Sequence, residues 1–420
     1  MDLIETFGAK IGALSEEKPQ RARQLLTAGF RANGVKNKLA SKRSSKSDRM
    51  LFQLVNRAMV TCLAKPQSNV MVSLFTPCEM LHLQGLHPYS CEGFSSYLSG
   101  AMAEQPFLHQ AEDTGIPNSL CSYHKVFIGA AQMGLMPKPR FILSTSLACD
   151  ANTLTFRHLA QFYDVPHFNV DIPFESSPQA VDYVAGQLRQ MGEFLTRQTG
   201  LPLDDGQLAR TVARSQRTMA LYHRGLRLRA GRQVLSDLTS ELLRTAAFHF
   251  LLGTPETEAY ARQLLREITT APPAQGKQLL WIHTTPYWVA PLRHLFAQST
   301  RVQVAACDMS YEGIVEADPT KPYEAMARRL VYSPFNGPAQ RRIDRALEMA
   351  KTVGADGAVW FCHWGCKHTL GGARLGKKAL EEAGLPTLLL DGDSCDRGFG
   401  GEGQAATRME AFLEVLEGMA

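Results

Sequence analysis

The sequence predicts an α/β protein built from two similar lobes, each a doubly wound parallel sheet, with helical segments before and between them. Short apolar runs of strand length alternate with helix-length segments, which is typical of parallel sheets covered by helices on both faces. The pattern occurs twice, and a long stretch of helical periodicity separates the two occurrences. A chain of 420 residues is also too long for one hydrophobic core, so more than one domain is expected.

The expected elements divide the chain into four parts. An N-terminal helical segment, a first α/β lobe, a helical connection and a second α/β lobe with a C-terminal helix are expected over residues 1–67, 68–200, 201–275 and 276–420. The first lobe is expected to contain buried strands at residues 71–77, 139–150 and 165–174. The second lobe is expected to contain strands at residues 278–288, 301–310, 357–366 and 385–396.

The composition excludes some classes of partner. Lys and Arg number 45 against 40 Asp and Glu, and a net charge of +5 over this length does not indicate nucleic acid as the main partner. No apolar run reaches the length of a membrane span, and the first residues lack the layout of a signal peptide. We therefore expect a cytoplasmic protein without a membrane partner.

Several of the nine cysteines fall where expected strands end. Cys78, Cys149, Cys366 and Cys395 each follow a strand, and Cys121 precedes an apolar helix. Ligands of open α/β sheets bind beyond the carboxyl ends of strands, so these thiols are expected near one rim. Cys121 and Cys149 lie 28 residues apart, and Cys366 and Cys395 lie 29 apart, about one strand–helix step in each lobe.

The thiol pattern leaves two kinds of metal site open. Cys362, Cys366 and His368 are spaced closely enough for a tetrahedral zinc site, which would make the chain a non-catalytic scaffold. Thiols from distant segments that converge at strand ends favour an iron–sulfur cluster, since clusters accept widely separated thiolates. A phosphate-binding loop is not expected at residues 371–378, because Lys378 stands where the magnesium-binding Ser or Thr would be.

The motifs C-S-x-H-K, A-C-D, H-W-G-C and G-D-x-C-D occur in this order, and the chain from about residue 70 onward resembles the 2-hydroxyacyl-CoA dehydratase and benzoyl-CoA reductase superfamily. The resemblance implies a metal-binding enzyme of anaerobic metabolism that works in electron transfer. It implies that Cys121, Cys149 and Cys366 hold a 4Fe–4S cluster whose fourth iron is left for substrate or a non-protein ligand. It also implies a separate ATP-hydrolysing iron–sulfur activator that supplies low-potential electrons.

The surplus of thiols resembles the double-cubane cluster branch of that superfamily. Two cubanes joined by a sulfide need six thiolates, and the expected set is Cys78, Cys121, Cys149, Cys362, Cys366 and Cys395. Cys362 is the least secure member, with Cys307 or Cys91 as alternatives, and Cys62 and Cys91 are expected to be structural. The function implied is an oxidoreductase, expected as a homodimer, that reduces a small unsaturated molecule. The alternative is a subunit of a 2-hydroxyacyl-CoA dehydratase with a single 4Fe–4S cluster.

Three further residues are candidates for catalysis because they flank cluster cysteines. His124 and His363 have a side chain that can transfer protons near neutral pH, although buried histidines often only bind nearby backbone. Glu79 follows Cys78 and is expected either to tune the cluster through outer hydrogen bonds or to stabilise a helix N-terminus.

Overall fold

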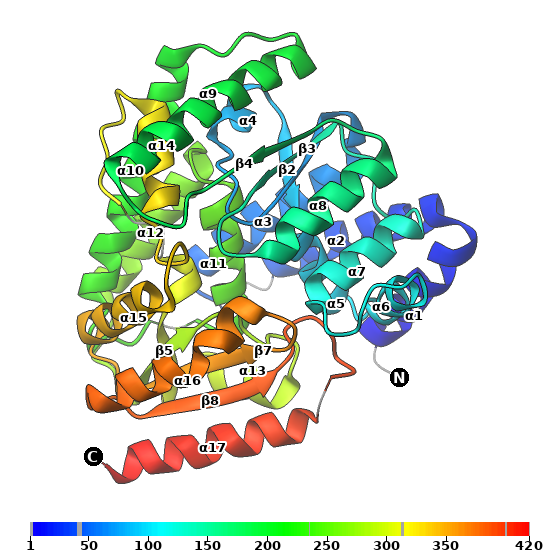
Figure 1. Cartoon of the computed structure of the whole chain (residues 1–420). Helices are drawn as coiled ribbons and strands as arrows, with labels where there is room; N and C mark the ends of the chain where they lie inside the picture. The colour runs from blue at the N-terminus through cyan, green and yellow to red at the C-terminus, as the bar shows by residue number, and fades with distance from the viewer. Residues whose placement is uncertain (1–2, 40–43, 235, 312–314, 400, 420) are drawn as a thin grey trace.

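The computed structural model describes residues 3–39, 44–234, 236–311, 315–399 and 401–419, and its strands form two four-stranded parallel sheets (Figure 1). The first sheet has the order β2-β1-β3-β4. Its strands are β1 (Asn69–Val72), β2 (His87–Ser90), β3 (Phe141–Thr145) and β4 (His167–Val170). All three pairings in this sheet are parallel.

The second sheet repeats this topology with the order β6-β5-β7-β8. Its strands are β5 (Lys277–Ile282), β6 (Val302–Cys307), β7 (Gly357–His363) and β8 (Thr387–Gly392). In both sheets the chain leaves the first strand toward one neighbour and then crosses to the other side. The predicted α/β architecture with two similar doubly wound lobes is therefore confirmed.

Helices cover both sheets and fill the space between them. The N-terminal segment contains α1 (Leu3–Glu17), α2 (Pro19–Leu39) and α3 (Lys46–Ala64). The helices between β1 and the connection are α4 (Glu79–Leu83), α5 (Cys91–Gly100), α6 (Gln105–Asp113), α7 (Ser122–Gln132), α8 (Asp150–Tyr163) and α9 (Pro178–Thr199). The connection contains α10 (Asp205–Leu228), α11 (Leu238–Phe250) and α12 (Pro255–Thr270). The second lobe adds α13 (Ala290–Phe296), α14 (Pro322–Val331), α15 (Ala339–Val353), α16 (Lys367–Glu382) and α17 (Glu402–Gly418).

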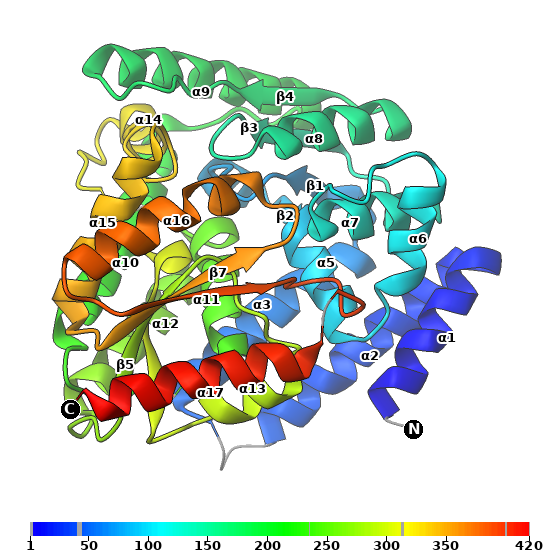
Figure 2. The same ribbon diagram turned by 60° about the horizontal axis from the view of Figure 1, so that its bottom comes forward.

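The two lobes share buried apolar packing. Helix α3 contacts β2 of the first sheet and also α11 and α12 of the connection. Figure 1 shows α3 and α11 between the two sheets, and Figures 1 and 2 both show α17 along the outer side of β8. One continuous apolar core contains Leu51 of α3, Val70 of β1 and Trp281 of β5, so burial of this surface stabilises both lobes together.

The structure differs from the expected elements in strand β2 and in strand lengths. Strand β2 was not expected, since it has only four residues and contains Pro88. It lies at the edge of its sheet, which is where a strand tolerates a residue without an N–H group. The division at residues 67, 200 and 275 stays a prediction. Within the described residues, no helix is long and apolar enough to cross a membrane.

Candidate iron–sulfur site

Two cysteines occupy equivalent loops of the two lobes. In a sheet of this order, successive strands are added first on one side of the first strand and then on the other. The switch point lies between the first and third strands, and ligands bind there at the carboxyl ends of the strands. Cys149 follows β3 of the first lobe, and Cys366 follows β7 of the second. Cys149 in the first lobe is therefore equivalent in position to Cys366 in the second lobe. The similar intervals of 28 and 29 residues, which predicted the shared rim, do not join equivalent cysteines.

Three cysteines begin helices and line the same cavity. Cys121, Cys149 and Cys366 are the N-cap residues of α7, α8 and α16, and none of their side chains caps its own helix. All three line one cavity of about 980 Å³. The partial positive charge at each helix N-terminus stabilises an anionic sulfur there. The N-termini of three helices thus border one cavity, and they carry the three cysteines that the resemblance implied as cluster ligands.

The three thiols are close enough to affect one another. Burial raises the pKa of the Cys149 thiol to about 12, and the nearby Cys366 contributes. The pKa of Cys121 lies well above its ordinary value, first because of burial and then because of Cys366, Asp393 and Cys149. The protein alone therefore holds these side chains as thiols, and binding of a metal centre would release their protons.

Gly365 allows the loop before Cys366 to pack directly on Cys121. Its φ angle is +76°, a conformation that other residues rarely adopt. A Cβ atom at Gly365 would lie 2.7 Å from both the Cα and the backbone N atom of Cys121. The close approach of these two cysteine loops therefore depends on glycine at this position.

His363 interacts with the sulfur of Cys121. Its Nε2 atom lies 3.3 Å from the Sγ atom of Cys121, and its Nδ1 atom accepts a hydrogen bond of 3.1 Å from the Ser394 backbone N–H. Burial lowers the pKa of His363, against the opposite effect of Asp393, so the ring is neutral. Because Nδ1 accepts, the single ring proton is on Nε2 and points to the sulfur.

The closely spaced Cys362, Cys366 and His368 do not form a site for a single metal ion. Over the described residues, no three His, Cys, Asp or Glu side chains are close enough to hold one metal ion. Cys362 belongs to strand β7, where neighbouring side chains point to opposite faces, and it does not line the cavity that His363 lines. The zinc site that this spacing left open is therefore not formed.

The other predicted thiolates lie apart from the cavity lining. The Sγ atom of Cys78 lies 3.2 Å from the carbonyl oxygen of Thr76, and Cys78 does not line the cavity. Cys395 is fully buried beside the backbone of Ser95 and is also outside the lining. Together with Cys362, these residues complete the six predicted ligands. The structure brings three of the six to one cavity.

The alternative thiols differ in their surroundings, and Cys91 lies near Cys121, Cys149 and Cys395. Cys91 lies 3.4 Å from the carbonyl oxygen of Tyr123, and Cys307 lies 3.3 Å from that of His283. Cys62 lines the cavity from helix α3. None of these three thiols begins a helix at the switch point of a lobe.

The predicted catalytic residues have different surroundings. His124 lines the cavity, and burial lowers its pKa to about 4, so it is neutral. Glu79 is outside the lining, and both of its carboxylate oxygens bind Arg329 at 2.7 and 3.0 Å. Burial would raise the pKa of Glu79, but the charge and hydrogen bonds of Arg329, together with hydrogen bonds from the backbone and Ser215, lower it below its ordinary value. Glu79 therefore joins α4 to α14 and does not face the candidate site.

Sequence reasoning missed two polar residues of the cavity, Glu92 and His283. Glu92 is in the first turn of α5, and burial raises its pKa to about 7, against hydrogen bonds from Ser90 and Asn152. His283 directly follows β5, on the other side of the switch point from Cys366. Its position after a strand was the one signal in the sequence, because neither residue belongs to a recognisable motif.

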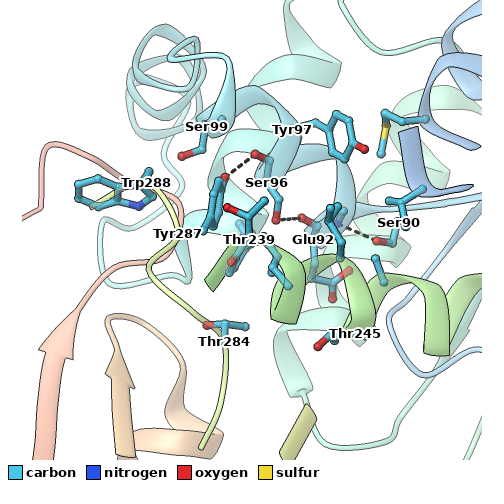
Figure 3. Close-up of a pocket in the computed structure, with 18 of the residues that line it drawn as sticks. Ser90, Glu92, Ser96, Tyr97, Ser99, Thr239, Thr245, Thr284, Tyr287 and Trp288 are labelled. Atoms are coloured by element: carbon cyan, nitrogen blue, oxygen red, sulfur yellow. Dashed lines mark hydrogen bonds between the residues drawn. The ribbon is translucent and has the colours of Figure 1, made fainter. Parts of the chain in front are cut away.

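Most of the cavity wall is apolar, and aromatic side chains are prominent in it. Figure 3 shows Tyr97, Tyr287 and Trp288 around one part of the cavity, with Glu92 on α5. The Tyr287 hydroxyl donates a hydrogen bond to the carbonyl oxygen of Ser96, which ties the second lobe to α5. Exposed Lys36 also lines the cavity, which therefore reaches from the three cysteines to helices α1 and α2.

Comparisons with known proteins found a matching family and a distant relative. Residues 73–416 match the family described as 2-hydroxyglutaryl-CoA dehydratase, D-component. The chain is also similar to the (R)-phenyllactyl-CoA dehydratase alpha subunit of Clostridium sporogenes, with 22% identity over 337 residues. That alignment covers 74% of this chain and 80% of the relative. The matched region begins just after β1 and contains strands β2 to β8 and all three cavity cysteines that begin helices.

Proposed function

The chain belongs to the 2-hydroxyglutaryl-CoA dehydratase D-component family, and from this membership we propose that it is a cluster-bearing subunit of a 2-hydroxyacyl-CoA dehydratase. Enzymes of this family are iron–sulfur dehydratases that depend on an activator. The observation that carries the proposal is the meeting of Cys121, Cys149 and Cys366 on one cavity. Three thiolates hold one cubane and leave its fourth iron for another ligand.

Cys121, Cys149 and Cys366 are the proposed ligands of a single 4Fe–4S cluster. When bound, the cluster would supply one electron at low potential, received from the ATP-dependent activator. The protein stabilises its negative charge with three helix N-termini and the Nε2–H group of His363. A double cubane is not proposed, because Cys78 and Cys362 do not reach the cavity.

The apolar cavity is proposed to hold the acyl group of a thioester. Aromatic and aliphatic side chains, among them Phe30, Met59 and Phe250, line it over a volume of about 980 Å³. This volume is in the range of pockets that bury a whole small molecule. The relative acts on phenyllactyl-CoA by its name, and an aromatic acyl group suits this lining. The exposed cations Lys36 and Arg293 line the same cavity and suit the phosphates of coenzyme A.

Glu92 is the proposed acid–base residue. Dehydration removes the hydroxyl group from C2 and a proton from C3 of the acyl chain, and the two leave as water. A carboxyl group with a pKa near 7 can accept the C3 proton and return it to the departing hydroxyl at neutral pH. Glu92 meets this need, since its pKa is about 7 and it lines the cavity near Cys149.

The proposal is tested on the anaerobically purified chain, alone and with a second dehydratase subunit and an ATP-dependent activator. Iron and labile sulfide should be near four per chain. (R)-Phenyllactyl-CoA, used as the probe thioester, should lose water to give the 2,3-unsaturated thioester only when ATP and activator are present. Cys121→Ser, Cys149→Ser and Cys366→Ser should each remove iron, because an alkoxide is a poorer iron ligand than a thiolate. Cys78→Ser and Cys362→Ser are matched controls that should keep it.

Two results would contradict the proposal. Iron near eight per chain that falls in Cys78→Ser or Cys362→Ser would restore the double-cubane reductase. A fully iron-loaded assembly that dehydrates neither the probe nor other 2-hydroxyacyl thioesters would remove the dehydratase function.

A further inference from the structure

We propose that His283 is the residue that donates a hydrogen bond to the thioester carbonyl oxygen at the cysteine end of the cavity. The inference rests on the proposed dehydratase function and names a contact within that site. His283 lines the cavity and is only 8% exposed. Within the described part of the chain, neither of its ring nitrogens has a hydrogen-bond partner. A buried polar side chain that lines a cavity and has no hydrogen-bond partner in the protein indicates a ligand that completes it.

The other histidines of the cavity are already engaged. His363 binds Cys121 and Ser394, and the Nδ1 atom of His124 lies 3.7 Å from the Sγ atom of Cys91. His368 contacts Arg342 through Nδ1 at 3.4 Å and the Phe335 carbonyl oxygen through Nε2 at 3.3 Å. The ring centroid of His283 lies 6.0 Å from that of His363. His283 thus has a ring without a hydrogen-bond partner and lies next to His363, which contacts Cys121.

The backbone of His283 is held in a conformation that favours glycine. Its φ angle is +85°, which is rare for a residue with a side chain. Its N–H group donates a hydrogen bond of 2.7 Å to Asp308, and its carbonyl oxygen accepts one from the Cys307 thiol at 3.3 Å. Backbone strain of this kind gathers at functional sites. A glycine would satisfy both backbone bonds without strain, so neither bond requires the imidazole.

The charge of the ring suits a hydrogen-bond donor. Burial lowers the pKa of His283 well below its ordinary value, and Arg342, His363 and His368 lower it further. The neutral ring keeps one N–H donor. A bound iron–sulfur cluster would supply one electron to the thioester, and His283 would then donate its hydrogen bond to the negatively charged carbonyl oxygen while the ring keeps its proton. A preorganised donor aimed at such an oxygen stabilises the transition state more than the ground state.

The test compares His283→Gly with Gln298→Gly in the iron-loaded chain. Gln298 has a φ angle of +53°, is exposed, and is not among the cavity-lining residues, so both changes relieve a similar backbone conformation. Both variants should keep full iron and the wild-type cluster spectrum, and their Tm should equal or exceed that of the wild type. In His283→Gly, kcat with the probe thioester should fall by about 10²–10³-fold, as for loss of one oxyanion donor, while KM changes little. Gln298→Gly should turn over like the wild type.

Added imidazole should restore part of the activity of His283→Gly, because the deletion leaves space for the ring. His283→Asn tolerates a positive φ angle and keeps a donor, so it should retain more activity than His283→Gly and serves if the glycine variant does not fold. Turnover of both His283→Gly and His283→Asn within twofold of the wild type would overturn the proposal. Loss of iron or a changed cluster spectrum in either of these two His283 variants would also overturn it, since His283 would then act on the cluster. An inactive wild-type assembly would instead refute the dehydratase function, and this contact with it.

Discussion

The Nε2 atom of His363 lies 3.3 Å from the Sγ atom of Cys121, and the Ser394 backbone N–H fixes the ring so that the Nε2 proton faces the sulfur. Hydrogen bonds to cluster sulfurs are one of the levers that set the reduction potential of an iron–sulfur centre. An N–H donor stabilises the more negative, reduced state. His363 is therefore expected to make the cluster easier to reduce, in place of the proton transfer predicted from the sequence.

His363→Phe should keep the cluster but make its midpoint potential more negative. If the bond contributes about 1.4 kcal/mol to the reduced state, the shift for a one-electron couple is on the order of 60 mV. His363→Gln can still donate a hydrogen bond and should shift the potential less. Redox titration followed by electron paramagnetic resonance measures both. An unchanged potential in His363→Phe, with full iron content, would show that the contact does not tune the cluster.

Gly365→Ala should disrupt cluster binding. The new Cβ atom would lie 2.7 Å from backbone atoms of Cys121, so the two cysteine loops must separate. Gly384→Ala is a matched control, because Gly384 has a φ angle of +83° and a Cβ atom added there would have no neighbour within 4 Å among the described residues. Each change should cost about 1–2 kcal/mol for the left-handed backbone. Iron analysis should show loss in Gly365→Ala and full binding in Gly384→Ala, and equal iron in both would remove the role of the close approach.

The parts of the site that the sequence predicted follow from the regular geometry of parallel sheets. Cys149 and Cys366 were expected at a common rim because the carboxyl ends of parallel strands meet at one edge. The two lobes were also visible in the repeated strand–helix pattern, which the sheet orders confirm. These features depend on periodicity that is present in the chain itself.

The predicted ends of the strands before Cys78 and near Cys362 differ from those in the structure, because the sequence does not define where a strand stops. Strand β1 ends at Val72 and not near residue 77, so a loop separates Cys78 from it. Strand β7 includes Cys362 and His363, and alternation along the strand directs these neighbours to opposite faces. Glu92 and His283 were missed because their burial is created by tertiary packing, beside Ser90 and Asn152 for Glu92 and beside Asp308 and His363 for His283. No local pattern in the chain carries that information.

Glu79→Gln should destabilise the fold while the cluster site is kept. The change removes the carboxylate that pairs with Arg329 and accepts a hydrogen bond of 2.9 Å from Ser215. Breaking one partner of a buried ion pair typically costs about 3–5 kcal/mol, because a charge is left without compensation. The double variant Glu79→Gln with Arg329→Met removes both charges and should recover part of the loss. Chemical denaturation measures the cost, and iron loss without destabilisation would return Glu79 to the cluster environment.

Glu92 should give the proposed reaction a pH dependence. The pKa of its carboxyl is raised by burial to about 7, and the proposed role needs the carboxylate to accept the C3 proton. The rate of dehydration should therefore rise about tenfold per pH unit below pH 7 and level off above it. Glu92→Gln should abolish this limb and lower kcat by about 10²–10⁴-fold, since amides do not accept protons at this pH. A rate that falls with rising pH near 7 would instead assign Glu92 as the acid.

The same carboxyl should also affect folding stability, in the direction opposite to a salt-bridged acid. Its pKa rises from 4.5 in the unfolded chain to about 7 in the fold, so the folded protein binds more protons between these values. Stability should consequently fall as pH rises from about 4.5 to 7. Burial raises the pKa of Asp48 to about 6 and adds a slope of the same sign below pH 6. Glu92→Gln should remove the slope that extends to pH 7 and keep the part due to Asp48. Denaturation curves at several pH values separate the two, and an unchanged slope between pH 6 and 7 would show that Glu92 is ionised in the fold.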